Sequence, residues 1–253
     1  MRTVFISDKN NEQRRQNVQD ETSKIGLEFT FFDAIMANRM NPKEVASKAL
    51  PNTFLTFSEI GCALSHLGVY KEFLSSNDKS ILICEDDIYF TDEFTLERVE
   101  DIRQFVENTD EPRIVVLQKS IYHNVCLEDV DKSLSIYSAL NLFGTFGYII
   151  NRKAAENIVQ IQNIVRFEID AFKFYYWLDK CQLYCLNRDL ILPIAEDIIT
   201  STVSGNNSEI SNVMSKQDSF KPLYQQLSFR GKILCHWRRL RKALHRPFET
   251  LDY

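Results

Sequence analysis

Short apolar runs alternate with segments of helical periodicity along the first 190 residues. The apolar runs predict buried strands at residues 4–6, 29–32, 81–84, 113–117, 146–150 and 182–186. Between them, residues 7–20 begin as a loop and continue as a helix, and residues 153 to about 164 predict another helix. This alternation predicts an α/β fold with a mostly parallel central sheet. Ligands bind such sheets beyond the carboxyl ends of the strands, so the residues that follow each strand are the first candidates for a site.

The clearest helix begins at Thr56, which has capping-box spacing to Glu59. The apolar residues that then recur at helical spacing are Ile60, Ala63, Leu64, Leu67, Tyr70 and Leu74. His66 lies one position away from this apolar stripe. A single histidine in such a place is usually packed in the core, and a role in a site is the alternative.

The composition is that of an ordinary globular protein, with 44% hydrophobic and 26% charged residues among 253. Only three apolar residues follow the first polar ones, which is shorter than a signal peptide requires. No window approaches eighteen apolar residues, so we expect no membrane span. We therefore expect the six cysteines to be free thiols.

Three adjacent acids, Glu85, Asp86 and Asp87, directly follow the predicted strand 81–84. Adjacent carboxylates repel one another unless a cation offsets them. Oxygen ligands favour Mg²⁺ or Mn²⁺ over zinc, and such an ion neutralises a leaving diphosphate. In an extended chain Glu85 and Asp87 point the same way and could share the ion. A solvated acidic turn is the alternative, but the position after a buried strand favours a metal site.

Several motifs in a fixed order resemble one known family. They are Arg14-Arg15, Phe31-Phe32-Asp33-Ala34, residues 58–67 (SEIGCALSHL), Tyr70-Lys71, the acidic triplet, residues 144–150 (GTFGYII) and residues 152–155 (RKAA). This order is similar to that of the bacterial lipooligosaccharide glycosyltransferases of family 25, which include β-1,4-galactosyltransferases. Animal collagen galactosyltransferases are distant relatives. The likeness extends over roughly residues 3–200.

The resemblance implies a GT-A-type, Rossmann-like domain over residues 1–218. It also implies an inverting transfer of a hexose, with galactose favoured, from a UDP-sugar to a lipooligosaccharide or lipopolysaccharide core acceptor carried on lipid A. UDP-glucose or a UDP-N-acetylhexosamine is an alternative donor. A degenerate carbohydrate-binding homologue is an alternative function. A nucleotidyltransferase is disfavoured because residues 7–20 contain no glycine for a phosphate loop.

The same resemblance suggests roles at the acidic triplet. Many GT-A enzymes hold Mn²⁺ or Mg²⁺ through an Asp-x-Asp motif, and this chain has Glu85-x-Asp87 instead. Asp87 is therefore the stronger expected ligand and Glu85 the weaker one. Asp86 is expected to face the ribose or the donor sugar.

The remaining donor contacts are expected near the ends of the first two strands. Ser7 follows the first strand, where a nucleotide base docks in this fold class. Arg14 and Arg15 suit bidentate phosphate or uridine recognition, and Asp33 suits the uracil or ribose. A solvated helix face for the arginines and a helix cap for Asp33 are equally open.

The donor sugar is expected to meet two further residues, His66 and Thr145. An inverting transferase also needs a general base for the acceptor hydroxyl. Asp170 and Glu168 are the candidates, because neighbouring aromatic residues suit sugar stacking and raise a carboxylate pKa. Glu196 and Asp197 form a weaker pair of candidates.

Residues 219–253 form a basic segment at the end of the chain. They contain eight Lys or Arg and two acids, a net charge of +6, whereas residues 1–218 carry −11. One helical face carries the apolar residues Ile233, Trp237, Leu240 and Leu244. This pattern predicts binding to an anionic membrane surface, hence a peripheral position on the cytoplasmic face of the inner membrane. A helix packed on the domain is the alternative. We expect no nucleic acid partner, because the rest of the chain is acidic.

Overall fold

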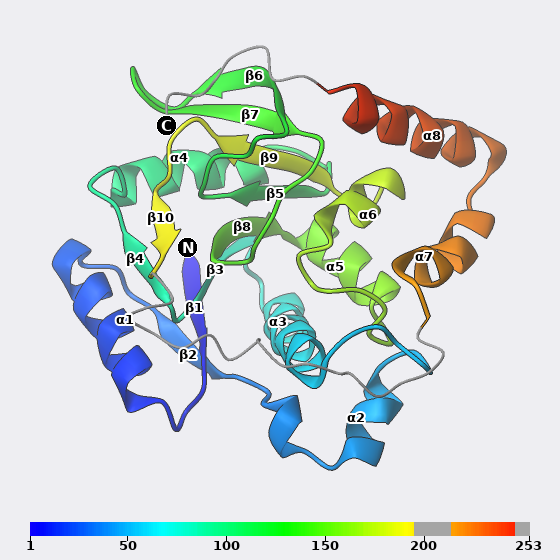
Figure 1. Ribbon diagram of the computed structural model, residues 1–253. Coiled ribbons are helices and arrows are strands. Elements are labelled where there is room, and N and C mark those ends of the chain that lie inside the picture. Colours follow the sequence, from blue (N-terminus) through cyan, green and yellow to red (C-terminus); the bar gives the residue numbers. More distant parts are fainter. Residues whose placement is uncertain (195–213, 246–253) are drawn as a thin grey trace.

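Eight strands form one sheet in the computed structural model, which describes residues 1–194 and 214–245 (Figure 1). The strand order is β2-β1-β3-β8-β5-β9-β7-β6. The strands are β1 Arg2–Ser7, β2 Thr30–Asp33, β3 Ser80–Glu85, β5 Arg113–Val116, β6 His123–Asp129, β7 Ser135–Ala139, β8 Gly147–Asn151 and β9 Gln182–Leu186. A separate antiparallel pair joins β4 Ile88–Phe90 to β10 Ile191–Pro193.

The sheet is mixed but mostly parallel in direction. Strand β1 runs parallel to β2 and β3, and β9 runs parallel to β5. Strand β8 is antiparallel to β3 and β5, and β7 is antiparallel to β9 and β6. Six strands therefore share one direction, and β8 and β7 oppose it. The predicted α/β class, with a sheet that is parallel in its first half, is confirmed.

Helices cover both faces of this sheet (Figure 1). They are α1 Glu12–Ile25, α2 Pro42–Lys48, α3 Phe57–Ser75, α4 Leu96–Glu107, α5 Arg152–Ile161, α6 Phe172–Trp177, α7 Lys216–Gln225 and α8 Phe229–Leu244, with a 3-10 turn, η1, at Ala37–Arg39. The six predicted strands and the predicted helices are present, with boundaries shifted by up to five residues. The Thr56–Glu59 capping box is confirmed in both directions.

Alternating side chains of the central strands feed two cores. Along β3, Ile81 and Ile83 join the core beneath α3 and α5, whereas Leu82 and Cys84 join the core beneath α1 and α4. Both faces of a strand are buried in this way, which explains why the central strands read as continuous apolar runs. The same burial makes the carboxyl end of β3 a rigid support for the acidic triplet.

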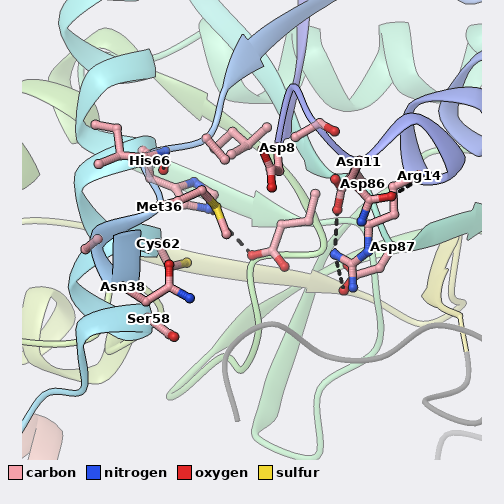
Figure 2. Close-up of a pocket in the computed structure, with 17 residues that line it drawn as sticks. Asp8, Asn11, Arg14, Met36, Asn38, Ser58, Cys62, His66, Asp86 and Asp87 are labelled. Carbon is pink, nitrogen blue, oxygen red and sulfur yellow. Dashed lines mark hydrogen bonds and ion pairs between the residues drawn. The ribbon is translucent and has the colours of Figure 1, made fainter. Parts of the chain in front are cut away.

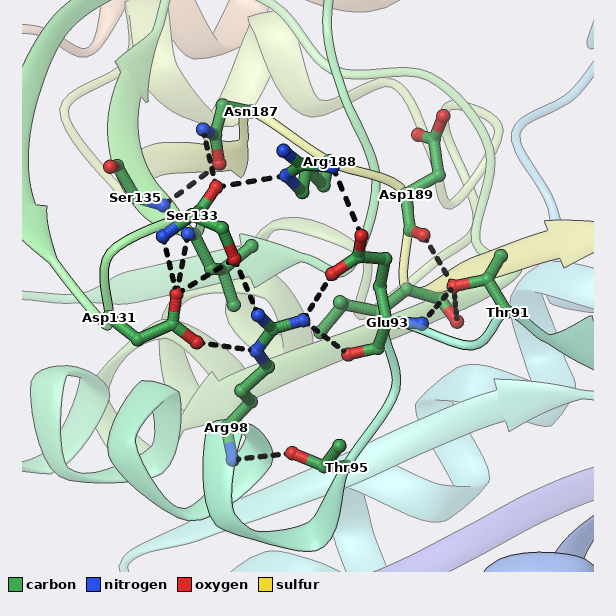
Figure 3. A network of polar contacts seen from close by, with 12 residues as sticks. Thr91, Glu93, Thr95, Arg98, Asp131, Ser133, Ser135, Asn187, Arg188 and Asp189 are labelled. Atoms are coloured by element: carbon green, nitrogen blue, oxygen red, sulfur yellow. Dashed lines mark hydrogen bonds and ion pairs between the residues drawn. The ribbon is translucent and has the colours of Figure 1, made fainter.

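The hairpin of β6 and β7 was not predicted, because β6 is a half-exposed edge strand without an apolar run. A polar network fixes the hairpin to the start of α4 (Figure 3). Arg98 donates from Nε to Asp131 at 2.6 Å and also pairs with Glu93. Glu93 in turn pairs with Arg188, which follows β9. Contacts between distant segments thus stabilise a hairpin that the local pattern of apolar residues does not predict.

The basic end of the chain forms two helices, and the predicted boundary after residue 218 falls inside α7. Helix α8 packs against α6 through Cys235 and Arg238 and leaves its apolar stripe outward. None of the helices in the described residues is both long and apolar enough to cross a bilayer. All six cysteines are free, as predicted.

Candidate active site

A pocket opens at the carboxyl ends of β1 and β3, where the strand-end rule placed it (Figure 2). Its empty volume, counted together with the adjoining open solvent, is about 720 Å³. The walls come from the end of β1, the start of α1, residues 34–38 and the first half of α3. All three acids that follow or end β3 face this space, so the acidic triplet lines a pocket.

Arg14 lies between two members of the triplet (Figure 2). Its Nη1 is 2.8 Å from Oδ1 of Asp86 and 3.4 Å from Oδ2 of Asp87. Arg14 is only 6% exposed, so this cation offsets two acids where little solvent screens them. The protein itself therefore relieves part of the repulsion within the triplet. From the sequence, only a metal ion was considered for this role.

The three acids of the triplet have different surroundings. Burial raises the pKa of Asp87 to about 6, and the charge of Glu85 adds to the effect. Burial also raises the pKa of Asp86, although Ser7 and Arg14 oppose it. For Glu85, burial is outweighed by His66 and Thr145, and the net pKa is lowered. Glu85 is thus the firmly ionised member, and Asp87 is the one that gains most from a cation.

The extended backbone on which a shared ion at Glu85 and Asp87 was made conditional is not present. Strand β3 ends at Glu85, and the chain bends at Asp86 and Asp87. Glu85 accepts a hydrogen bond from the Thr145 hydroxyl and lies 3.6 Å from Nε2 of His66. Glu85 and Asp87 therefore make different contacts, although both line the pocket.

His66 is fully buried and faces this pocket. Its Nδ1 forms a hydrogen bond of 2.8 Å with the Tyr148 hydroxyl, which lies 2.7 Å from that of Tyr70. Its Nε2 has no hydrogen-bond partner within 3.5 Å among the described residues. The tyrosine pair fixes the ring so that Nε2 is directed at Glu85, an arrangement typical of histidines that hold metals or substrates.

The residues around the triplet fit a divalent cation. Oδ1 of Asp87 is buried and lacks a hydrogen-bond partner in the described part of the chain. Cys62, His66 and Glu85 also bring one ligand atom each to within 4.8 Å of one another. Burial raises the pKa of the Cys62 thiol well above its usual value, so this thiol remains protonated. Carboxylate oxygens with an imidazole would be the better ligand set, and His66 would be a further ligand that the sequence did not indicate, although Asp87 is not part of the group formed by Cys62, His66 and Glu85.

Arg15 and Asp33, the other predicted nucleotide contacts, lie outside the pocket lining. They form an ion pair with each other, and Arg15 also donates to the Ser7 carbonyl at 3.2 Å and covers the Phe31 ring. Ser7 itself is buried and lines the pocket. The sequence analysis did not select two further lining residues, Asp8 and Asn11; both fall in the loop after β1 that the strand-end rule indicates.

The two candidate bases differ in their contacts. Asp170 precedes α6, and its Oδ2 accepts a 3.2 Å hydrogen bond from the Gly144 amide. Burial raises the pKa of Asp170, and the charges of Glu168 and Glu85 add to this effect. Glu168 instead forms an ion pair with Lys216. Asp170 is thus the better placed base, whereas Glu196 and Asp197 lie outside the described residues.

Comparison with known protein families gives one match over most of the chain. The sequence model described as "Glycosyltransferase family 25 (LPS biosynthesis protein)" matches residues 1–173. The lipooligosaccharide biosynthesis protein lic2B of Haemophilus influenzae is 29% identical over 162 residues, 58% of each chain. Procollagen galactosyltransferase 1-B of Xenopus laevis is 25% identical over 181 residues, 66% of this chain and 30% of that protein.

This chain covers less than two thirds of the length of these relatives, and only 26% of a glycosyltransferase 25 family member from Aedes aegypti. Among solved structures, the glycosyltransferase GlyE of Streptococcus pneumoniae aligns with a TM-score of 0.41 and 9% identity. That alignment covers 98% of this chain and 65% of GlyE.

Proposed function

Because the chain belongs to glycosyltransferase family 25, we propose that it transfers a hexose from a UDP-sugar to a hydroxyl of an acceptor saccharide. The observation that carries this proposal is the acidic triplet lining a pocket at the end of β3, with Arg14 and His66 beside it. Galactose is the favoured sugar, since the galactosyltransferases of Xenopus are among the relatives. The lipooligosaccharide relative favours a lipooligosaccharide or lipopolysaccharide core as the acceptor.

In this proposal, the donor diphosphate occupies the pocket next to the triplet. Asp87 and Glu85 would hold Mn²⁺ or Mg²⁺, with His66 as a third ligand. The bound ion would supply positive charge that stabilises UDP as it departs. Arg14 opposes the rise in the pKa of Asp86 that burial causes, and Asp86 would face the ribose or the sugar. Ser7, at the end of β1, would meet the uracil.

The chemical step is a single displacement at the anomeric carbon. The acceptor oxygen forms a bond to C1 of the sugar while the bond from C1 to the UDP oxygen breaks, which inverts the anomeric configuration. Asp170 takes the proton of the acceptor hydroxyl. Its raised pKa suits this role, because a stronger base removes a hydroxyl proton more readily.

The test is UDP release from a panel of UDP-sugars with an oligosaccharide acceptor, in Mn²⁺ and in EDTA. The donor that supports release identifies the sugar and separates galactose from glucose and the N-acetylhexosamines. We expect EDTA to remove the activity, and Asp87→Ala to lower it to near background. No release from any donor would favour a carbohydrate-binding homologue without turnover.

We further propose that helix α8 holds the enzyme at an anionic membrane, on the cytoplasmic face where the lipid-linked acceptor would be made. Five apolar residues of α8 are 49% to 80% exposed, namely Phe229, Ile233, Trp237, Leu240 and Leu244. Arg230 and Arg239 are exposed on the same helix. An exposed apolar stripe with flanking cations suits the boundary between lipid headgroups and acyl chains. Each such cation contributes about 1 kcal/mol at an anionic surface.

A further inference from the structure

A second hollow lies between helices α6, α7 and α8, on the side of the molecule where these helices gather (Figure 1). The lining residues that matter here are Lys173, Trp177, Lys216, Lys221, Tyr224 and Arg239. Its composition is unusual for an acidic chain, because four cations meet aromatic rings in one concave surface. The donor pocket uses none of these residues.

The cations of this hollow have few anionic partners. Among the described residues, Lys173, Lys221 and Arg239 form no ion pair within 4.0 Å, and Lys216 pairs with Glu168. Asp218 is the single acid in the lining, and its carboxylate is already engaged by Ser215 in a capping box. Burial and the charges of Lys242 and Lys216 lower the pKa of Lys173, whereas the charges of Glu168 and Asp170 raise it. The hollow therefore keeps a net positive charge that an anion would neutralise.

Aromatic rings form the other part of the surface. Trp177 and Tyr224 are half-buried in the lining and pack around Phe220, at centroid distances of 6.0 Å and 6.4 Å. Phe220 is held in turn by Phe174, at 5.2 Å. The Arg239 guanidinium lies over Trp177 at 5.2 Å from the ring centroid, and the Lys232 ammonium lies over Tyr224 at 5.8 Å. The remaining apolar surface of the two rings is rigid and could pack against the CH face of a sugar ring. Cations and rings together suit a charged saccharide better than a bare ion.

The hollow also adjoins the candidate base. Lys216 on its rim pairs with Glu168, which lies two residues before Asp170. Asp170 lines neither the donor pocket nor the hollow, but its neighbour Glu168 contacts the hollow through Lys216, and the charge of Lys216 opposes the rise in the pKa of Asp170 that burial causes. An acceptor held in the hollow could thus present its hydroxyl to Asp170.

Resting on the proposed transferase function, we propose that this hollow is the acceptor subsite and that it selects a saccharide carrying a phosphate or carboxylate group. The sugar ring packs on Trp177 and Tyr224, and Lys173, Lys221 and Arg239 bind the anionic group. A neutral oligosaccharide would leave these cations unpaired and would bind more weakly.

The test is a binding titration of the full chain, carried out in the Trp237→Phe background so that Trp177 is the one remaining tryptophan. The probes are glucose 6-phosphate, glucose and inorganic phosphate. We expect saturable quenching of Trp177 by glucose 6-phosphate at least about tenfold tighter than by either other probe, because the charge-assisted bonds add to the ring contact. The double substitution Lys221→Gln with Arg239→Gln should remove that preference. Lys132→Gln, an exposed lysine of the β6–β7 turn, is the matched control.

Four outcomes would overturn the inference. Glucose binding as tightly as its phosphate would exclude a role for the cations, and phosphate binding as tightly would exclude the sugar surface. If the double variant Lys221→Gln with Arg239→Gln keeps its melting temperature and binds glucose 6-phosphate as tightly as Lys132→Gln does, the site lies elsewhere. Quenching of Trp177 by phosphatidylglycerol vesicles without any quenching by the soluble sugar phosphate would assign the hollow to a lipid headgroup. The titration needs no turnover, so UDP release by the wild-type chain tests the proposed function separately.

Discussion

The carboxylates of Glu85 and Asp170 are connected through two consecutive residues. The Thr145 hydroxyl donates to Glu85, and the Gly144 amide donates to Asp170 at 3.2 Å. A candidate metal ligand and the candidate base are thus positioned by the same short segment before β8. The charge of Glu85 also adds to the raised pKa of Asp170, so the two carboxylates are coupled electrostatically as well as structurally.

Removing the base should stop transfer without preventing donor binding. We expect Asp170→Asn to lower the transfer rate by roughly 10²- to 10⁴-fold, the usual contribution of a general base. Binding of UDP, measured by calorimetry, should change little because Asp170 lies outside the lining of the donor pocket. Glu168→Gln is the comparison, and we expect a smaller loss because Glu168 is paired with Lys216. If Glu168→Gln lowers the transfer rate more than Asp170→Asn does, Glu168 is the candidate base and Asp170 is not.

Metal affinity should depend on pH through Asp87, whose pKa is raised from 3.8 to about 6. Below pH 6 the carboxyl holds a proton that the ion must displace, so Mn²⁺ affinity should rise between about pH 5 and pH 7. The stability of the metal-free chain should change with pH in the opposite direction to the metal affinity. The folded state takes up this proton more readily than the unfolded state, so the contribution of Asp87 to stability falls as pH rises from 3.8 to about 6.

Electron paramagnetic resonance of bound Mn²⁺ measures this affinity without turnover. Asp87→Asn should weaken the Mn²⁺ affinity by at least roughly 10- to 100-fold, which is the effect of removing a group that only contacts a metal ligand. The Mn²⁺ affinity of this variant should also depend less on pH. An unchanged pH profile in Asp87→Asn would remove Asp87 from the ligand set. His66→Gln tests the third ligand in the same experiment.

Gly144 should resist substitution for two separate reasons. Its φ is +70°, and a Cβ added there would lie 2.6 Å from the Phe146 ring. Gly26 has φ +66° but no neighbouring atom within 4 Å, so it isolates the backbone effect. We expect Gly26→Ala to lose about 1–2 kcal/mol of unfolding free energy. Gly144→Ala should lose more and should also slow transfer, because the amide that contacts Asp170 moves. If urea unfolding shows that the two variants lose the same unfolding free energy, the Phe146 ring moves aside without a measurable cost.

Membrane binding should depend on the outward stripe of α8 and not on its buried face. We expect Trp237→Ser with Leu240→Ser to reduce cosedimentation with phosphatidylglycerol vesicles while the melting temperature stays constant. Leu127→Ser on β6 is the control, because Leu127 is 51% exposed and lies on another element. Wild-type binding should weaken with salt and with phosphatidylcholine vesicles, since the cations contribute. Salt-independent binding would contradict the electrostatic part of the proposal.

Arg238 separates the two faces of α8. It is buried, donates to the Tyr176 carbonyl and pairs with Asp179 at 2.7 Å. Arg238→Gln should therefore lower the melting temperature, and vesicle binding at low temperature should stay close to that of wild type. Arg238 is one of the eight basic residues of the segment 219–253, but its contacts show that it supports the fold.

The sequence by itself determined the features that depend on near neighbours. Continuous apolar runs gave the central strands, because a strand buried on both faces needs apolar side chains at every position. The capping box placed the start of α3, because its two hydrogen bonds join residues three apart. The acidic triplet and the family motifs are likewise local patterns, and they located the donor pocket at the end of β3.

Only the tertiary structure decided which of these residues meet. Thr145 and Glu85 are 60 residues apart, and the pairing of β8 with β3 brings them together. His66 and Tyr148 are 82 residues apart, and the packing of α3 on the sheet brings them together. The placement of Arg14 against Asp86 depends on how α1 packs against β1 and β4. The outward direction of the α8 stripe depends on how α8 packs against α6. Periodicity reports which face of a segment is apolar, but the partner of that face is set by contacts between distant segments. The bend at Asp86 and Asp87 and the separate contacts of Arg15 therefore could not be read from the chain.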